Sequence, residues 1–304
     1  MKKCAVVFPG QGSQHVGMGK DFLKDERFSR YIDEADNVLS FKLSKLIFEG
    51  PEDELTLTQN AQPAIFTVSY GIFQYAFEYL KDKFEFFLGG HSLGEYTALS
   101  CAGAISFSDC VNLVRLRGKF MQEAVPEGHG GMIALVSSRE KVEQEIKNFE
   151  NVWIANINSQ EQVVVSGRKD SIDQFADHMR KKGIRVIPLK VSAPFHCPLM
   201  YPARLRLQKV LEAIQINKLN FKVLSAHTLE YYSVENVKNT LLDGITSEVN
   251  FYGFVKKLYQ DEGIDIFIEV GPGKVLSSLI KRILPNAKII SVNGPVGLEQ
   301  LKDL

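Results

Sequence analysis

The chain has 304 residues, 45% of them hydrophobic, which suffices for one large domain or for a body with a smaller insert. Its 36 basic and 36 acidic side chains cancel, so no overall positive field favours a nucleic acid or an anionic membrane. No apolar run approaches the length of a membrane-spanning helix, and the first apolar run is too short for a signal peptide. We therefore expect a globular cytoplasmic protein that binds neither nucleic acid nor membrane.

Cysteine usage gives no sign of a metal site or of disulfides. The four cysteines have no C-x-x-C spacing and are scattered among apolar neighbours: Cys4, Cys101, Cys110 and Cys197. This pattern is typical of buried free thiols, and we expect no bound metal.

The chain opens with an apolar run, residues 4–8, which predicts a strand, and continues into a glycine-rich loop, residues 9–14. The loop matches neither of two phosphate-binding motifs. The last glycine of G-x-G-x-x-G would fall on His15, and Met18 stands where a P-loop has lysine. Two interpretations stay open: a plain strand-to-helix turn, or a loop whose backbone N–H groups face a developing anion.

The most informative motif is G-x-S-x-G at residues 90–94, Gly-His-Ser-Leu-Gly. It lies between a predicted strand at 84–88 and a predicted helix at 96–102, which is the strand-turn-helix context that the motif requires. Glycines allow a turn so tight that the serine hydroxyl is held out at the head of the helix. Ser92 is therefore the predicted nucleophile.

A second informative residue lies on the helix predicted to begin near Ser106, with Asp109 as its capping-box partner. The neighbours of Arg117 three and four positions away are all apolar: Leu113, Val114, Phe120 and Met121. A buried arginine needs an anionic partner, which would be either an internal carboxylate or the carboxylate of a substrate. Arg115, with mixed neighbours, is expected to be its solvated counterpart.

Residues 128–194 form a recognisable small unit between Ser92 and the later histidines. The expected strands are 132–136, 152–157, 162–166 and 184–191, and the expected helices are 138–149 and 171–182. The order βαββαβ is that of a small ferredoxin-like sheet. Residues 1–127 and 195–304 would then form a larger α/β body of the α/β-hydrolase type, with 267–270 as a late core strand.

A serine hydroxyl needs a base to take its proton. Five of the six histidines lie in the elbow or in polar and loop-like stretches, and His91 of the elbow is expected to point away from the nucleophile. His196 differs, because it lies in the rigid, apolar segment 192–198 at the return to the large body. It is the candidate base, and an ordinary packed histidine is the alternative.

A basic run, residues 179–182, ends the second helix of the small unit and is followed by Gly183. Its cations either complement the helix dipole or dock an acidic carrier domain.

Taken together, six motifs in order closely resemble the malonyl-CoA:acyl carrier protein transacylases. They occupy residues 8–14, 62–64, 90–96, 117–125, 194–196 and 269–273, so that the resemblance covers essentially the whole chain. The resemblance implies that Ser92 carries an acyl ester, that His196 acts as general base and then acid, and that the backbone N–H groups of Gln11 and Leu93 form the oxyanion hole.

The same resemblance implies that Arg117 binds the malonyl carboxylate and that Gln62 lines its pocket. It also implies that the small subdomain covers the cleft, and Phe195 is similar to the residue of malonyl-selective members. The implied reaction is ping-pong transfer from malonyl-CoA to the phosphopantetheine thiol of an acyl carrier protein, in fatty-acid or polyketide synthesis. It needs no metal or redox cofactor, and we expect a monomer.

One segment departs from the family pattern. Gly244 replaces a glutamine whose backbone carbonyl is thought to orient the histidine, and Glu248 replaces a proline. The departure leaves two alternatives open: a paralogue that serves polyketide assembly, and an acyl hydrolase that clears carrier proteins. A catalytically silent carrier-binding module is a third, which the intact serine and histidine argue against.

Overall fold

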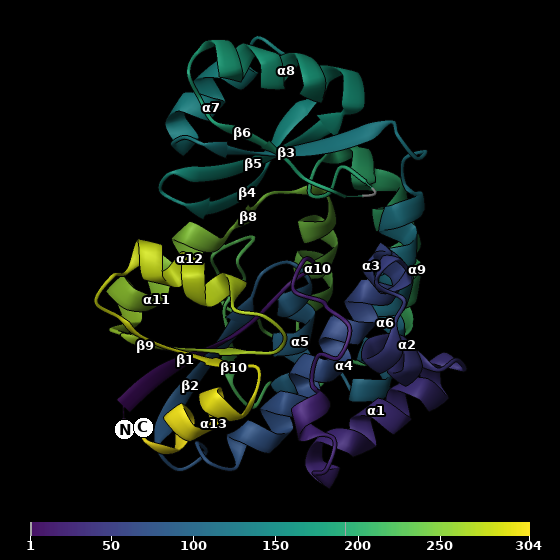
Figure 1. The fold of residues 1–304 in the computed structure, drawn as a ribbon, viewed down its shortest axis with the longest axis vertical. Coiled ribbons are helices and arrows are strands. Elements are labelled where there is room, and N and C mark those ends of the chain that lie inside the picture. Colours follow the sequence, from purple (N-terminus) through teal and green to yellow (C-terminus); the bar gives the residue numbers. More distant parts are fainter. Residues whose placement is uncertain (1, 192) are drawn as a thin grey trace.

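The computed structural model describes residues 2–191 and 193–304, which form a larger and a smaller subdomain, each built around one five-stranded sheet (Figure 1). The larger sheet is parallel throughout, with the order β10-β9-β1-β2-β7. Its strands are β1 (Lys2–Phe8), β2 (Phe84–Gly90), β7 (Lys222–Val223), β9 (Ile266–Val270) and β10 (Lys288–Val292). The predicted strands at 4–8, 84–88 and 267–270 are confirmed, and their unbroken apolar runs are typical of a parallel sheet covered on both faces.

Alternate residues of the central strand β1 face two separate cores. Val6 packs into the main cluster with the long helices, while Ala5 and Val7 pack into a second cluster with α11 and α12. The helices of the larger subdomain are α1 (Glu26–Leu39), α2 (Leu43–Glu49), α3 (Glu52–Thr56), α4 (Thr58–Phe77), α5 (Leu93–Cys101), α6 (Phe107–Glu123), α9 (Tyr201–Ala213), α10 (Val237–Thr246), α11 (Phe251–Glu262), α12 (Val275–Ile283) and α13 (Pro295–Lys302). Within the described residues, no helix is both long and apolar enough to cross a membrane.

The smaller sheet has the order β6-β3-β5-β4-β8 and confirms the predicted βαββαβ sequence of elements. Its elements are β3 (Gly130–Val136), α7 (Arg139–Ile146), β4 (Val152–Ser159), β5 (Gln162–Arg168), α8 (Lys169–Lys181) and β6 (Val186–Pro188). Ser138 caps α7 by accepting a hydrogen bond from the Lys141 amide. The last strand is shorter than the predicted 184–191.

The boundary between the subdomains is less simple than the sequence suggests. A fifth strand, β8 (Val249–Asn250), comes from the C-terminal part of the chain and pairs in parallel with β4, with Asn156 opposite Val249. The small sheet is therefore attached to the large subdomain through its edge as well as through the connecting chain.

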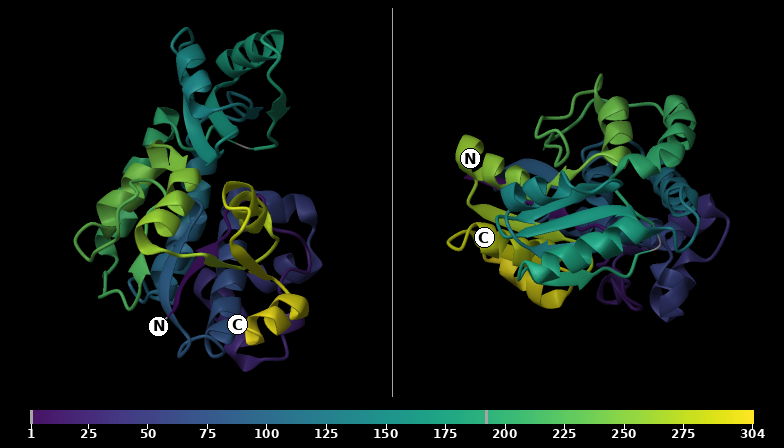
Figure 2. Two further views of the ribbon diagram at one scale, coloured as in Figure 1. Left: turned by 90° about the vertical axis from the view of Figure 1, so that its left-hand side faces the viewer. Right: turned by 90° about the horizontal axis from the view of Figure 1, so that it is seen from above.

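The small sheet lies above the carboxyl ends of the parallel strands, with α7 and α8 on its outer face (Figures 1 and 2). On that outer face Ile133 and Val165 pack with both helices, whereas Met132 and Val164 point the other way, into the cleft between the subdomains. Ligands of open parallel sheets bind at this carboxyl edge, so the fold itself predicts where a site will be.

Candidate active site

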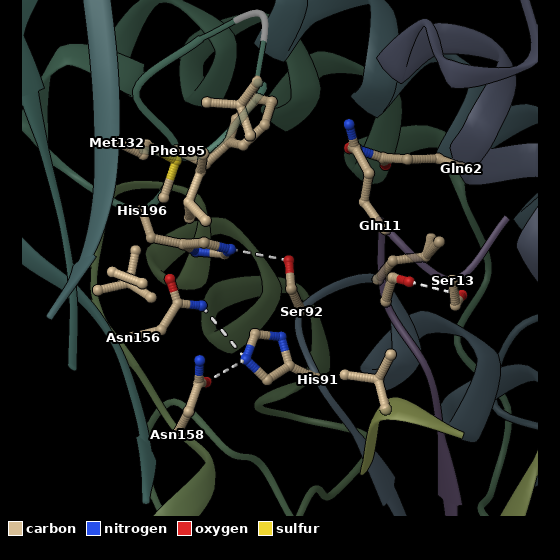
Figure 3. A pocket seen from close by; sticks show the side chains of 18 of the residues that line it. Gln11, Ser13, Gln62, His91, Ser92, Met132, Asn156, Asn158, Phe195 and His196 are labelled. Atoms are coloured by element: carbon tan, nitrogen blue, oxygen red, sulfur yellow. Dashed lines mark hydrogen bonds between the residues drawn. The ribbon is translucent and has the colours of Figure 1, made fainter. Parts of the chain in front are cut away.

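A cavity of about 340 Å³ lies between the two subdomains. Its walls come from the loop after β1, the elbow after β2, helices α4 and α6, and the inner face of the small sheet. The predicted site residues all line it: Gln11, Gln62, Ser92, Leu93, Arg117 and His196. In Figure 3 the side chain of His196 points to Ser92, and Gln11 and Gln62 lie on the other side of the serine.

The elbow that carries Ser92 depends on close backbone approach. Ser92 has φ 54° and ψ −101°, a left-handed conformation that a residue with a side chain seldom adopts, and the next residue begins α5. A Cβ on Gly94 would lie 2.0 Å from the carbonyl oxygen of Phe8, and a Cβ on Gly90 would lie 2.5 Å from the carbonyl carbon of Gly94. Only glycine fits at either position, as the motif predicts.

The structure brings His196 to Ser92 across 104 positions of sequence. The Nε2 of His196 lies 2.8 Å from the Oγ of Ser92 (Figure 3). Its Nδ1 lies 2.9 Å from the carbonyl oxygen of Gly244. Since a carbonyl only accepts, Nδ1 carries the proton and donates it there, which leaves the lone pair of Nε2 facing the hydroxyl. Gly244 thus provides the orienting carbonyl, although it lacks the side chain of the glutamine that it replaces.

The environment of His196 keeps its ring neutral. The side chain is 5% exposed, and burial together with the positive charge of Arg117 lowers the pKa of His196 to about 3. A neutral imidazole can accept the hydroxyl proton at any pH near neutrality. The arrangement therefore has the geometry and the protonation state of a nucleophile and its general base.

Arg117 is 2% exposed and has only neutral partners. Its Nη1 donates to the Oε1 of Gln62 over 2.7 Å, its Nη2 donates to the Oγ of Ser92 over 3.0 Å, and the guanidinium lies 4.8 Å from the ring centre of Tyr96. No Asp or Glu among the described residues forms an ion pair with it, and its Nε has no partner there. The internal ion pair, one of the two interpretations of this residue, is therefore not found.

The expectation that Arg115 is solvated is wrong, and a proline explains why. Pro63 lies inside α4, where it has no N–H to donate to the carbonyl of Gln59 four residues earlier. The Nη1 of Arg115 donates to that carbonyl over 2.9 Å and also to Asn60. The half-buried side chain therefore replaces the hydrogen bond that α4 lacks near Gln62. Burial lowers the pKa of Arg115 as a result.

Gln11 and Leu93, whose amides are the predicted oxyanion hole, both line the cavity. Leu93 is the first residue of α5, so its N–H has no partner inside the helix. Gln11 belongs to a loop that Ser13 fastens by donating to the carbonyl of Gly10 over 2.8 Å (Figure 3). The loop does not pass directly into a helix, because the next helical turn is the 3₁₀ segment Lys20–Phe22, so the plain strand-to-helix turn is not what forms here.

His91 and two asparagines also line the cavity, and the asparagines were not singled out from the sequence. The Nε2 of His91 lies 3.0 Å from the Oδ1 of Asn158 and 3.2 Å from the Nδ2 of Asn156, so the ring turns toward β4 and lines the cavity (Figure 3). Asn156 and Asn158 are two positions apart on a strand and therefore share its inner face. That alternation of polar residues was the available signal.

Other predicted features lie away from the cavity. The four cysteines are free and buried, as predicted. Within residues 2–191 and 193–304 no group of three His, Cys, Asp or Glu side chains could hold a metal ion. In the basic run, Arg180 pairs with Asp177 and Lys182 with Glu145, and Gly183 has φ +77°, so these cations have local structural partners at a helix end.

Comparison with known proteins places this site in a family. The model of the acyl transferase domain matches residues 5–300. The malonyl CoA-acyl carrier protein transacylase of Bacillus subtilis is 42% identical to this chain, over 98% of this chain and 96% of the length of the Bacillus protein. The crystal structure of the corresponding Clostridium perfringens protein superposes with a TM-score of 0.92 at 39% identity, over 98% of this chain and 95% of that one.

A third relative is a malonyl-transacylase solved in complex with a type II polyketide synthase acyl-carrier protein. It is 36% identical and covers 99% of both chains with a TM-score of 0.95. With family model, sequence identity and fold in agreement over nearly the full length, the chain belongs to the malonyl CoA-acyl carrier protein transacylases of the acyl transferase family.

Proposed function

We propose that this protein transfers a malonyl group from coenzyme A to the phosphopantetheine thiol of an acyl carrier protein, through an ester on Ser92. The observation that carries the proposal is a buried guanidinium with no carboxylate partner, 3.0 Å from the nucleophilic oxygen. A malonyl thioester has a free carboxylate at the distance of one methylene from the reacting carbonyl. It can therefore satisfy Arg117 while Ser92 attacks.

In the first half-reaction, the Oγ of Ser92 forms a bond to the thioester carbon while the Nε2 of His196 takes the hydroxyl proton. The carbonyl oxygen becomes an oxyanion, which the N–H groups of Gln11 and Leu93 would stabilise; one such donor is worth about 10²- to 10³-fold in rate. Collapse of the intermediate breaks the carbon–sulfur bond. His196 returns the proton to the departing coenzyme A sulfur.

The malonyl carboxylate would replace neutral partners of Arg117. A guanidinium binds a carboxylate through two parallel charge-assisted hydrogen bonds, which are stronger than the single bonds it now makes to Gln62 and Ser92. Ser92 already donates its hydroxyl proton to His196, and release from Arg117 would free a lone pair of the Ser92 oxygen for attack. Substrate binding would thereby complete the nucleophile.

The second half-reaction runs the same steps in reverse order with a different thiol. His196 takes the proton of the phosphopantetheine thiol, its sulfur attacks the malonyl ester, and Ser92 leaves with the proton. Since the acyl group moves from one thiol to another with no change of oxidation state, the proposed chemistry requires no metal and no redox cofactor.

The partners follow from the same proposal. A relative has been solved in complex with an acyl-carrier protein, and both fatty-acid and polyketide synthesis use such carriers, so we extend this partner to the present chain, acting as a monomer. The hydrolase alternative receives no support from the relatives. The carbonyl of Gly244 accepts from His196, so the general base is oriented although glycine stands in place of the family's glutamine.

The direct test incubates the protein with malonyl-CoA and a holo acyl carrier protein, followed by intact-mass spectrometry of both proteins. We expect malonylated carrier, a transient malonyl ester on the enzyme, and neither product with Ser92→Ala. Formation of free malonate without carrier malonylation would support the hydrolase instead. Absence of any acyl-enzyme would contradict both.

A further inference from the structure

Glu95 is a buried carboxylate that the transfer mechanism does not use. It lies three residues after Ser92 in the first turn of α5 and is 5% exposed. No Lys, Arg or His among the described residues forms an ion pair with it. A charged group this deeply buried is tolerated only where hydrogen-bond donors surround it.

The donors that surround Glu95 all come from one segment, the connection between β7 and α10. Tyr232 donates its hydroxyl proton to Oε2, and the hydroxyl of Ser225 and the amide of Ala226 also donate to the carboxylate. The oxygen of Ser225 accepts from the amides of His227 and Thr228, over 3.1 and 3.2 Å, so its own proton is free for Glu95. Burial raises the pKa of Glu95, and these hydrogen bonds oppose that effect.

The same connection is attached to the segment that orients the base. The Nδ1 of His227 lies 3.1 Å from the carbonyl oxygen of Glu248, and the amide of Asn250 donates to the carbonyl of Ala226 over 2.7 Å. In sequence, Gly244 of α10 lies after this connection and before Glu248 and Asn250, the two residues to which the connection is hydrogen-bonded. A small cavity, about 10 Å³ or the room of one water molecule, is lined by Glu95, His227 and Gly244 together with the catalytic pair.

We infer that Glu95 is a positioning residue, which fastens the helix of the nucleophile to the segment whose Gly244 carbonyl orients the general base. Ser92 and His196 lie 104 positions apart in sequence, and the protein must hold their 2.8 Å contact rigid. Glu95 joins the two supports by hydrogen bonds rather than by its charge. The inference depends on the proposed function only in taking Ser92 and His196 as the reacting pair.

The test replaces Glu95 with leucine, which has a similar size but accepts nothing, and with glutamine, whose amide oxygen can accept from Ala226 while its amide nitrogen donates to a hydroxyl. The readouts are the rate at which a fluorophosphonate labels Ser92, the kcat and KM for malonyl-CoA, and thermal unfolding. For Glu95→Leu we expect labelling and kcat to fall about 10- to 100-fold, with KM within about twofold, because a misplaced reacting pair slows chemistry without touching Arg117. Glu95→Gln should stay within about threefold of the wild type on all three.

Tyr232→Phe tests the inference if Glu95→Leu does not fold, since it removes a single donor and should slow labelling about threefold. Tyr231→Phe is its matched control, because that neighbouring hydroxyl binds Glu262 instead, over 2.8 Å, and its loss should leave labelling unchanged. Wild-type labelling in folded Glu95→Leu or in Tyr232→Phe would overturn the inference. An equal loss of labelling rate in Glu95→Gln and Glu95→Leu would also overturn it, because it would show that the negative charge of Glu95 is what matters. Labelling needs neither malonyl group nor carrier, so a wild-type protein that labels but does not transfer would refute the proposed function alone.

Discussion

The Nη2 of Arg117 lies 3.0 Å from the Oγ of Ser92, so a buried positive charge with only neutral partners is held against the nucleophile. Helix α6 presents this arginine among apolar residues, and Gln62 of α4 fixes its other end. Such a charge is costly unless a ligand compensates it. We therefore expect the site to be selective for an acyl group that carries its own anion.

A carboxylate supplied by the protein should abolish this selectivity. We expect Gln62→Glu to pair with Arg117 through the contact that Gln62 already makes, over 2.7 Å, and to compete with the substrate carboxylate. Since a hydrogen bond between charged groups contributes about 1.5–3 kcal/mol, kcat/KM for malonyl-CoA should fall about 10- to 100-fold. Acetyl-CoA, which has no free carboxylate, serves as the internal control and should be affected within about threefold. A variant that still prefers malonyl-CoA as strongly as the wild type would show that Arg117 does not bind the carboxylate.

The pH dependence of the nucleophile should lack the step usual for histidine. Burial, and then the charge of Arg117, lowers the pKa of His196 to about 3 from its ordinary 6.5. The neutral base therefore persists below pH 6, and fluorophosphonate labelling of Ser92 should be level between about pH 8 and pH 5. Arg117→Ala should move the acid limb to higher pH. Half-loss of wild-type labelling near pH 6.5 would contradict the neutral, desolvated base.

The same shift affects stability, with a definite sign. The unfolded chain binds a proton at His196 below about pH 6.5, whereas the folded chain does not until about pH 3. The contribution of His196 to the free energy of unfolding is thus fully present above about pH 6.5 and is lost progressively as the pH falls from about 6.5 to about 3. Urea unfolding of His196→Gln against the wild type, at pH 7.5 and pH 5, should show a smaller loss of stability on acidification in the variant.

Gly244→Ala should stabilise the fold and retain activity. Gly244 lies inside α10, and the Cβ of alanine would meet nothing nearer than the Cβ of His227 at 3.9 Å. Alanine in a helix is favoured over glycine by about 0.5–1 kcal/mol, and the carbonyl that binds His196 is unchanged. Gly118→Ala in α6 is the matched control and should destabilise, because its Cβ would lie 2.5 Å from the carbonyl oxygen of Thr58. Denaturant unfolding measures both, and a loss of stability in Gly244→Ala would show that this glycine is required by packing.

Local patterns predicted much of this architecture. The elbow at Ser92, the βαββαβ order of the small subdomain and the buried position of Arg117 each depend on neighbours within a few residues, which the sequence displays directly. The six ordered motifs added the roles of the remaining residues.

Features that depend on distant segments were missed. Arg115 was expected in solvent because the carbonyl that Pro63 leaves free belongs to another helix, 56 positions away from Arg115 in sequence. The pairing of β8 with β4 joins two short segments whose own patterns carry no such information. By contrast, His196 was correctly singled out among six histidines, although its distance of 2.8 Å from Ser92 is visible only in the fold.

The central claim is that Arg117 binds the free carboxylate of the acyl group. Its most direct test is the rate of acyl-enzyme formation from malonyl-CoA and from acetyl-CoA, measured for the wild type and for Arg117→Ala. Truncating one partner of a buried charge pair costs about 2–5 kcal/mol, so malonyl loading should fall at least about 30-fold while acetyl loading stays within about threefold. Equal losses for the two donors would show that Arg117 is structural, and would contradict the account.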